Sequence, residues 1–177
     1  MKRNFLLFFA VALLFTGIGA YFGDRHLSAD RLPAPAVRAL FASSMPGLND
    51  QSHPQPQALA QWKGKILLVN FWATWCTPCV QEIPALSALQ TGTRNENLQI
   101  IGIGIDSAAN MLEFSVKYKI SYPLYVAGIA GAGLLQAFGD QAGGLPFSVL
   151  VAPDGQIKRT YQGRLNMNEV LRDIASI

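Results

Sequence analysis

Cys76 and Cys79 are the two cysteines of the chain, and the sequence Cys-Thr-Pro-Cys separates them by two residues. This spacing brings two sulfur atoms within bridging distance on one turn of helix. The apolar run 65–72 predicts a buried strand before them, and the apolar residues at every third position from Val80 to Leu89 predict a helix that begins at about Thr77. Unpaired N–H groups at a helix N-terminus stabilise a thiolate. We therefore predict that Cys76 faces solvent with a lowered pKa and attacks disulfides, and that Cys79 resolves the mixed disulfide.

A structural disulfide and half of a metal site are the alternative interpretations of this cysteine pair. A structural disulfide across so short a loop would stabilise the fold little, and two cysteines cannot complete a four-thiolate zinc site. The pattern Gly102-Ile-Gly104 resembles part of a dinucleotide-binding loop, but Ser107 stands where the third glycine would be. We therefore predict neither a metal nor an organic cofactor.

The elements that must position the cysteines follow from the periodicity of apolar residues. Strands are predicted over residues 65–72, 98–105, 124–126, 147–151 and 157–162, and helices over 77–89, 110–119, 133–138 and 167–174. Pro153-Asp154-Gly155 predicts a hairpin turn between the last two strands, Asn166 or Asn168 is the predicted N-cap of the last helix, and Leu40-Phe41 is expected to open an edge strand. The order of elements predicts an α/β fold: a central mixed sheet with helices on both faces.

The composition excludes several classes of protein. Half of the 177 residues are apolar and 14% are charged, so the chain is too hydrophobic to be a disordered acidic or basic protein. The net charge is +3, but from Ala36 onward ten basic residues face nine acidic ones. No basic stripe remains for a phosphate backbone, and nucleic acid is not a predicted partner.

The N-terminus predicts a membrane anchor. Lys2 and Arg3 precede residues 5–22, which are uncharged; eighteen helical residues span roughly 27 Å, about the hydrocarbon thickness of a bilayer. We predict an anchor over residues 1–23, a linker over 24–37 and a domain over 38–177, held on the extracytoplasmic (periplasmic) side of the cell membrane by a single span. A cleaved signal peptide, with Ile18 and Ala20 at the recognition positions, is the alternative.

The segments NFWATWCTPC and GGLPFSVL resemble the TlpA/ResA group of membrane-anchored, thioredoxin-like thiol–disulfide oxidoreductases of bacteria. The resemblance extends from about Phe41 to Ile177. It implies a thioredoxin-like fold, an extracytoplasmic domain and a redox-active Cys76–Cys79 pair.

The resemblance also implies substrate-binding roles for three residues. Trp75 matches the tryptophan before the first active-site cysteine and would hold partner chains on its flat apolar surface; ordinary packing is the alternative. Pro146 matches the cis-proline that faces the disulfide in thioredoxin-like proteins, whereas the sequence alone favours a trans bond. Leu145 would then offer its backbone to an extended peptide.

Asn70 and Glu82 concern the proton of the second thiol. Asn70 stands where ordinary thioredoxins carry a buried aspartate, and an asparagine cannot accept a proton in that role. Glu82 lies three residues after Cys79, on the same helix face, and the TlpA/ResA group carries a glutamate there. We predict that Glu82 is catalytic as the proton acceptor; the alternative is a solvated glutamate near a helix N-terminus.

The predicted function is thiol–disulfide exchange that reduces disulfides of exported proteins, such as c-type apocytochromes. A membrane thiol carrier would return the electrons, because the exported compartment is oxidising. A thiol peroxidase is one alternative, for which Thr74 is near but an arginine is missing nearby. A copper-delivery module is the other, although no histidine follows His53.

Overall fold

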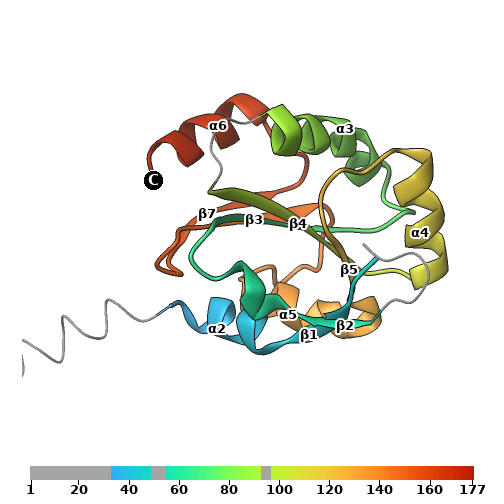
Figure 1. The fold of residues 1–177 in the computed structure, drawn as a ribbon, viewed down its shortest axis with the longest axis horizontal. Coiled ribbons are helices and arrows are strands. Elements are labelled where there is room, and N and C mark those ends of the chain that lie inside the picture. The colour runs from blue at the N-terminus through green and yellow to red at the C-terminus, as the bar shows by residue number, and fades with distance from the viewer. Residues whose placement is uncertain (1–32, 49–54, 93–96) are drawn as a thin grey trace, which may run out of the picture. The chain divides into compact units, whose positions relative to one another are not determined.

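The computed structural model describes residues 33–48, 55–92 and 97–177, which surround a five-stranded sheet (Figure 1). The strands are β3 (Ile66–Trp72), β4 (Leu98–Gly104), β5 (Leu124–Val126), β6 (Phe147–Val151) and β7 (Ile157–Gln162). Their order across the sheet is β5-β4-β3-β6-β7. Strands β3, β4 and β5 are parallel, whereas β6 and β7 pair antiparallel. This is the mixed sheet that the sequence predicts, and each strand lies within about a residue of its predicted range.

Strand β3 is the centre of the sheet because its sequence ILLVNFW can be buried on both faces. All seven residues are buried, and alternate side chains enter two separate apolar clusters. Ile66, Leu68 and Trp72 face one layer, and Leu67, Val69 and Phe71 face the other. Asn70 is the polar residue in this strand, and alternation places it in the layer of Trp72.

Helices cover both faces of the sheet, as predicted. They are α2 (Pro35–Ala42), α3 (Thr77–Gly92), α4 (Ala108–Lys117), α5 (Gly131–Ala137) and α6 (Met167–Ala175). Side chains of α3, α4 and α6 pack in the Trp72 layer, and those of α2 and α5 pack in the opposite layer; Figure 1 shows α3 and α6 across the sheet from α2 and α5. Asn166 caps α6, because its side chain accepts from the N–H groups of Asn168 and Glu169.

The start of the domain differs from the prediction. Residues 35–37, assigned to the linker, form the first turn of α2, and Ala36, Val37 and Leu40 are buried. Pro35 is compatible with this turn because a helix leaves its first N–H groups unpaired. The boundary between the linker 24–37 and the domain 38–177 is therefore wrong at this end, and the strand expected at Leu40-Phe41 is helical.

Short elements join α2 to the sheet: β1 (Ser44–Pro46) pairs antiparallel with β2 (Pro56–Ala58), and the 3-10 helix η1 (Leu59–Trp62) leads to β3. A second 3-10 helix, η2 (Gly128–Ala130), precedes α5. Residues 33–177 form one compact unit. The predicted membrane segment 5–22 lies outside the described residues, and within the described ranges no helix has the length and apolar character to cross a bilayer.

Candidate active site

Cys76 and Cys79 form a disulfide at the start of α3, with their Cα atoms 5.3 Å apart. The Cys76 carbonyl accepts the N–H of Val80 at 3.1 Å, so Cys76 is the N-cap of the helix. Its Sγ accepts the N–H of Cys79 at 3.3 Å, as a serine oxygen does in that position. A Cys76 thiolate would therefore be stabilised by an N–H group and by the helix dipole. The predicted order of strand, cysteine pair and helix is confirmed.

Cys76 is less exposed to solvent than the sequence predicts. Cys76 is 6% exposed and Cys79 is fully buried, so Cys76 is the more accessible sulfur, but in this disulfide form it does not face solvent freely. Trp75, by contrast, is 68% exposed. This excludes ordinary core packing for Trp75 and leaves a flat apolar surface directly beside the disulfide. Its role in substrate binding stays a prediction.

Glu82 is buried, at 2% exposure, so its interpretation as a solvated surface residue is wrong. Each carboxylate oxygen accepts one hydrogen bond: Oε1 from Asn70 Nδ2 at 2.7 Å and Oε2 from the backbone N–H of Leu165 at 3.0 Å. Burial raises the pKa of Glu82, and the hydrogen bonds from Leu165 and Asn70 and the charge of Arg164 oppose that rise without cancelling it. A carboxyl group of this kind can take up and release a proton closer to neutral pH.

Asn70 and Ser148 stand opposite each other in the antiparallel pair of β3 and β6. The Asn70 amide donates to Ser148 Oγ at 3.0 Å as well as to Glu82, and all three side chains are buried. Sequence reasoning missed Ser148 and Leu165. A serine within the apolar strand FSVLV was a detectable signal, whereas the contact of Leu165 with Glu82 spans 83 residues and had no signal in the sequence.

Asp106 holds the loop that leads into the cysteines. Its Oδ2 accepts both the backbone N–H and the hydroxyl of Thr74, and its Oδ1 accepts from Ser107 and Asn110. Desolvation favours a higher pKa for Asp106, but these hydrogen bonds, that of the Thr74 side chain foremost, outweigh it and lower the pKa. Because the Thr74 hydroxyl donates to this carboxylate, it does not serve Cys76 as a peroxidase threonine would.

Pro146 follows a cis peptide bond after Leu145, as the resemblance implies. Phe147, the next residue, pairs with Phe71 of β3. Pro146 is therefore at the end of β3 that leads to the cysteines, and its carbonyl accepts the N–H of Gly163 at 2.9 Å. Pro146 is buried and Leu145 is half-buried. Peptide binding by Leu145 stays a prediction.

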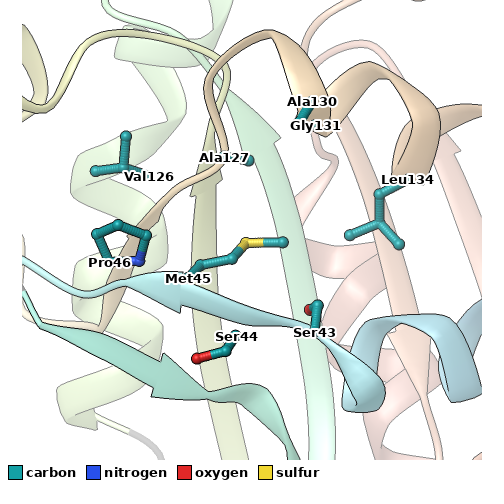
Figure 2. A pocket seen from close by; sticks show the side chains of 9 residues that line it. All are labelled: Ser43, Ser44, Met45, Pro46, Val126, Ala127, Ala130, Gly131 and Leu134. Carbon is teal, nitrogen blue, oxygen red and sulfur yellow. The ribbon is translucent and has the colours of Figure 1, made fainter.

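A pocket of about 440 Å³ lies between β1 and α5 (Figure 2). Its lining is Ser43, Ser44, Met45, Pro46, Val126, Ala127, Ala130, Gly131 and Leu134. Met45 extends across this pocket in Figure 2 and packs in the layer opposite to Glu82. None of the nine lining residues is a cysteine or a histidine, and none has an acidic or basic side chain. The pocket therefore supplies no group for the thiol–disulfide chemistry. In the described ranges, no group of three or more His, Cys, Asp and Glu side chains is arranged to hold a metal ion.

Comparisons with known proteins agree with the fold and the site. A model of the Redoxin family matches residues 29–174. The thiol–disulfide oxidoreductase ResA of Geobacillus thermodenitrificans is 24% identical over 178 residues, covering 100% of this chain and 94% of that protein. ResA of Bacillus thuringiensis is 28% identical over 165 residues, or 89% and 87% of the two chains.

Among the solved structures similar to this chain is that of a thioredoxin-related protein from Neisseria meningitidis serogroup B. It is 30% identical with a TM-score of 0.62, and the match covers 70% of this chain and 92% of that one. A secreted disulfide oxidoreductase of Mycobacterium tuberculosis, 20% identical with a TM-score of 0.63 over 78% of this chain and 98% of that one, shares the fold.

The chain belongs to the Redoxin family and has a thioredoxin-like fold. Within that family it is a TlpA/ResA-like thiol–disulfide oxidoreductase whose cysteine pair is Cys76–Cys79.

Proposed function

We propose that the chain is an extracytoplasmic reductant, anchored in the membrane through residues 5–22, which reduces disulfides of exported proteins such as c-type apocytochromes. The observation that carries the chemistry is the Cys76 sulfur at the N-cap of α3, beside an exposed Trp75. The uncharged segment behind Lys2 and Arg3 supports the location. A membrane thiol carrier supplies the electrons after each cycle.

The reduced protein carries out two exchange steps. The Cys76 thiolate attacks one sulfur of the substrate disulfide; that bond breaks, a mixed disulfide forms, and the other substrate sulfur leaves as a thiolate and takes a proton from water. Cys79 then gives its proton to Glu82, and its thiolate attacks Cys76 Sγ. The mixed disulfide breaks, the Cys76–Cys79 disulfide forms, and the second substrate sulfur leaves and is protonated. Two electrons have passed from the cysteine pair to the substrate.

Glu82 is the proton acceptor in this scheme. It lies one helical turn after Cys79, its carboxylate is buried, and its pKa is raised. Asn70, the neighbouring polar group on β3, cannot accept the proton. The Asp106 carboxylate accepts four hydrogen bonds, two of them from Thr74, and its pKa is lowered. Asp106 is therefore a weaker base than Glu82.

Reduction of insulin by dithiothreitol tests the assigned roles. Cys76→Ser should abolish catalysis, and Cys79→Ser should accumulate a mixed disulfide through Cys76. Full turnover in Cys79→Ser would show that the roles are assigned wrongly. Ser87→Ala, on the same helix but outside the site, is the matched control and should retain wild-type turnover.

The substrate class needs a separate measurement. An oxidised peptide of the form Cys-x-x-Cys-His, which mimics the haem-attachment site of an apocytochrome, should be reduced faster than the same peptide with scrambled flanking residues. The midpoint potential of Cys76–Cys79 in a dithiothreitol buffer, if clearly below that of the peptide, supports the reductive direction. A potential above that of the peptide would reverse it.

A further inference from the structure

Three buried polar atoms in the layer of Trp72 lack a hydrogen-bond partner in the described part of the chain. They are Asn70 Oδ1, Trp72 Nε1 and the Tyr122 hydroxyl oxygen; a fourth such atom, Asp140 Oδ2, follows α5. Asn70 is 1%, Trp72 0% and Tyr122 4% exposed. Leaving a buried polar group unpaired typically costs about 1–3 kcal/mol, so three of them in one layer require an explanation.

The strand register brings the three groups together. Asn70 and Trp72 are two residues apart on β3 and point to the same face. Gly102 of β4 pairs with Asn70, and a Cβ atom on Gly102 would lie 2.6 Å from Leu124 Cδ2, 3.1 Å from Trp72 Nε1 and 3.2 Å from Tyr122 Cε2. The missing side chain of Gly102 therefore leaves room for a Leu124 methyl group, the Trp72 indole N–H and the edge of the Tyr122 ring over the same part of the sheet, next to Asn70.

The chemistry of the three atoms is complementary to water. The indole N–H is a donor, the amide oxygen an acceptor, and the phenol hydroxyl is both. A buried water molecule needs two to four such partners. The other end of the same amide is fixed, because Asn70 Nδ2 donates to Glu82 Oε1 at 2.7 Å, and an ionised carboxylate can only accept.

We propose that Asn70 Oδ1, Trp72 Nε1 and the Tyr122 hydroxyl together bind one internal water molecule, which holds the Asn70 amide with its nitrogen toward Glu82. Tyr122 is then a positioning residue: it acts on Glu82 through the water and Asn70 and touches no reacting atom. The site keeps a hydrogen-bond donor on the Glu82 carboxylate and so limits how far burial raises its affinity for a proton. The inference rests on the proposed function only in giving that effect a role in exchange.

Few charged groups act on Glu82. Arg164, in the segment before α6, is the charged group that lowers its pKa. The titratable groups near it are Cys79, three residues earlier on α3, and Tyr122, in the segment before β5. Arg159 of β7 pairs with Glu169 and Asp173 of α6 instead. Burial raises the pKa of Tyr122, and the charge of Glu82 raises it further, which agrees with the phenol lying near the carboxylate.

Tyr122→Phe in the full chain, purified in mild detergent, tests the site because it removes only the hydroxyl. Carbon-13 NMR of the glutamate carboxyl groups, assigned with Glu82→Gln, would follow the titration of Glu82. We expect its midpoint to rise by about one pH unit, and the acidic limb of the exchange rate to fall about tenfold, with no change in rate at high pH.

Tyr125→Phe is the matched control. Tyr125 is also buried, but its hydroxyl accepts from Trp62 and Gln61 and its ring packs in the opposite layer. Removal of the Tyr125 hydroxyl should leave the midpoint of the Glu82 titration unchanged. An unmoved Glu82 midpoint in Tyr122→Phe would overturn the inference. A more stable protein in the same variant would show, in addition, that the hydroxyl is an unpaired buried group with no water.

The outcome is separable from that of the proposed function. If Glu82→Gln exchanges disulfides with an unaltered pH profile, Glu82 is not the proton acceptor; the Glu82 midpoint in Tyr122→Phe still decides the water site. If that midpoint does not move, the water site is rejected whatever Glu82→Gln shows.

Discussion

The Glu82 carboxyl group makes the stability of the fold depend on pH with a definite sign. Its pKa is raised above the ordinary value of 4.5, so the folded state binds this proton more tightly than the unfolded chain does. The free energy of unfolding should therefore fall as the pH rises from 4.5 through the folded pKa of Glu82, and level off above it. Urea denaturation across this range would measure the decline.

Glu82→Gln provides the control for that decline. The glutamine cannot ionise, so the free energy of unfolding of the variant protein should not fall as the pH rises above 4.5. Asp106 acts in the opposite direction and at lower pH, because its pKa is lowered from 3.8 and its contribution to stability is lost only on acidification. A variant curve parallel to that of the wild type above pH 4.5 would contradict the raised pKa of Glu82.

The same substitution should slow exchange. Without a proton acceptor, Cys79 loses its proton to water, and we expect resolution of the mixed disulfide to slow roughly 100-fold near neutral pH. The pKa of the Cys79 thiol should fall, because a neighbouring negative charge is removed. Thiol titration and rapid-mixing kinetics of the reduced protein would measure both effects, and unchanged values would return Glu82 to a purely structural role.

Single residues were predictable from the sequence where chemistry is local. The cysteine pair, the exposed Trp75 and the buried Trp72 follow from a motif between a strand and a helix. The hydrogen-bond partners of Asn70 and Glu82 did not, because Ser148 reaches Asn70 through the strand register and Leu165 reaches Glu82 through a contact distant in sequence. Asn70 inside an apolar strand and Glu82 on the following helix were each visible in the sequence, but the hydrogen bond between them was not.

At the scale of elements, the N-cap of α6 connects helix stability to the site. Asn166→Ala removes a cap and should lower the free energy of unfolding by about 1 kcal/mol. Leu165, whose N–H binds Glu82, immediately precedes this cap. We therefore expect Asn166→Ala to move the acidic limb of the exchange profile as well, measured by urea denaturation and by rates across pH.

Ser107→Ala is the matched control, since Ser107 caps α4 by accepting from the N–H of Asn110. This substitution should lower the free energy of unfolding by a similar amount. The dependence of its exchange rate on pH should stay the same as in the wild type. Equal shifts of the profile in both variants would indicate general loosening of the fold instead of a specific link through Leu165.

Elements with a strong periodicity of apolar residues were predicted well, whereas helix α2, which begins at Pro35, was not. Strand β3 and helix α3 begin within about a residue of the prediction because a continuous apolar run and a three-residue spacing have few other solutions. Helix α2 was missed because Pro33 and Pro35 favour extended backbone in isolation. Tertiary burial of Val37 and Leu40 stabilises the helix instead.

For the whole molecule, the proposed anchor predicts its behaviour in cells. Because residues 5–22 are uncharged and follow Lys2 and Arg3, we expect the protein to sediment with membranes, resist extraction by alkaline carbonate and be digested by protease added from the extracytoplasmic side. Mass spectrometry of the mature protein would show residue 1 or 2 at the N-terminus. A mature chain that begins near Tyr21, in the soluble fraction, would establish cleavage instead.

The distribution of the three tryptophans makes the molecule its own optical reporter. Trp72 is shielded in the core and Trp62 is hydrogen-bonded to Tyr125, whereas Trp75 is solvated and adjacent to Cys76. A disulfide quenches the emission of a neighbouring indole by accepting an electron from its excited state. Trp72 packs in the same apolar cluster as Cys76 and Cys79, so its emission can also respond, but it is buried and emits at shorter wavelength. Opening the disulfide should therefore brighten the red-shifted emission that comes from Trp75. Redox titrations and stopped-flow traces can then be recorded on the unlabelled chain, and Trp75→Phe should abolish the red-shifted part of the signal.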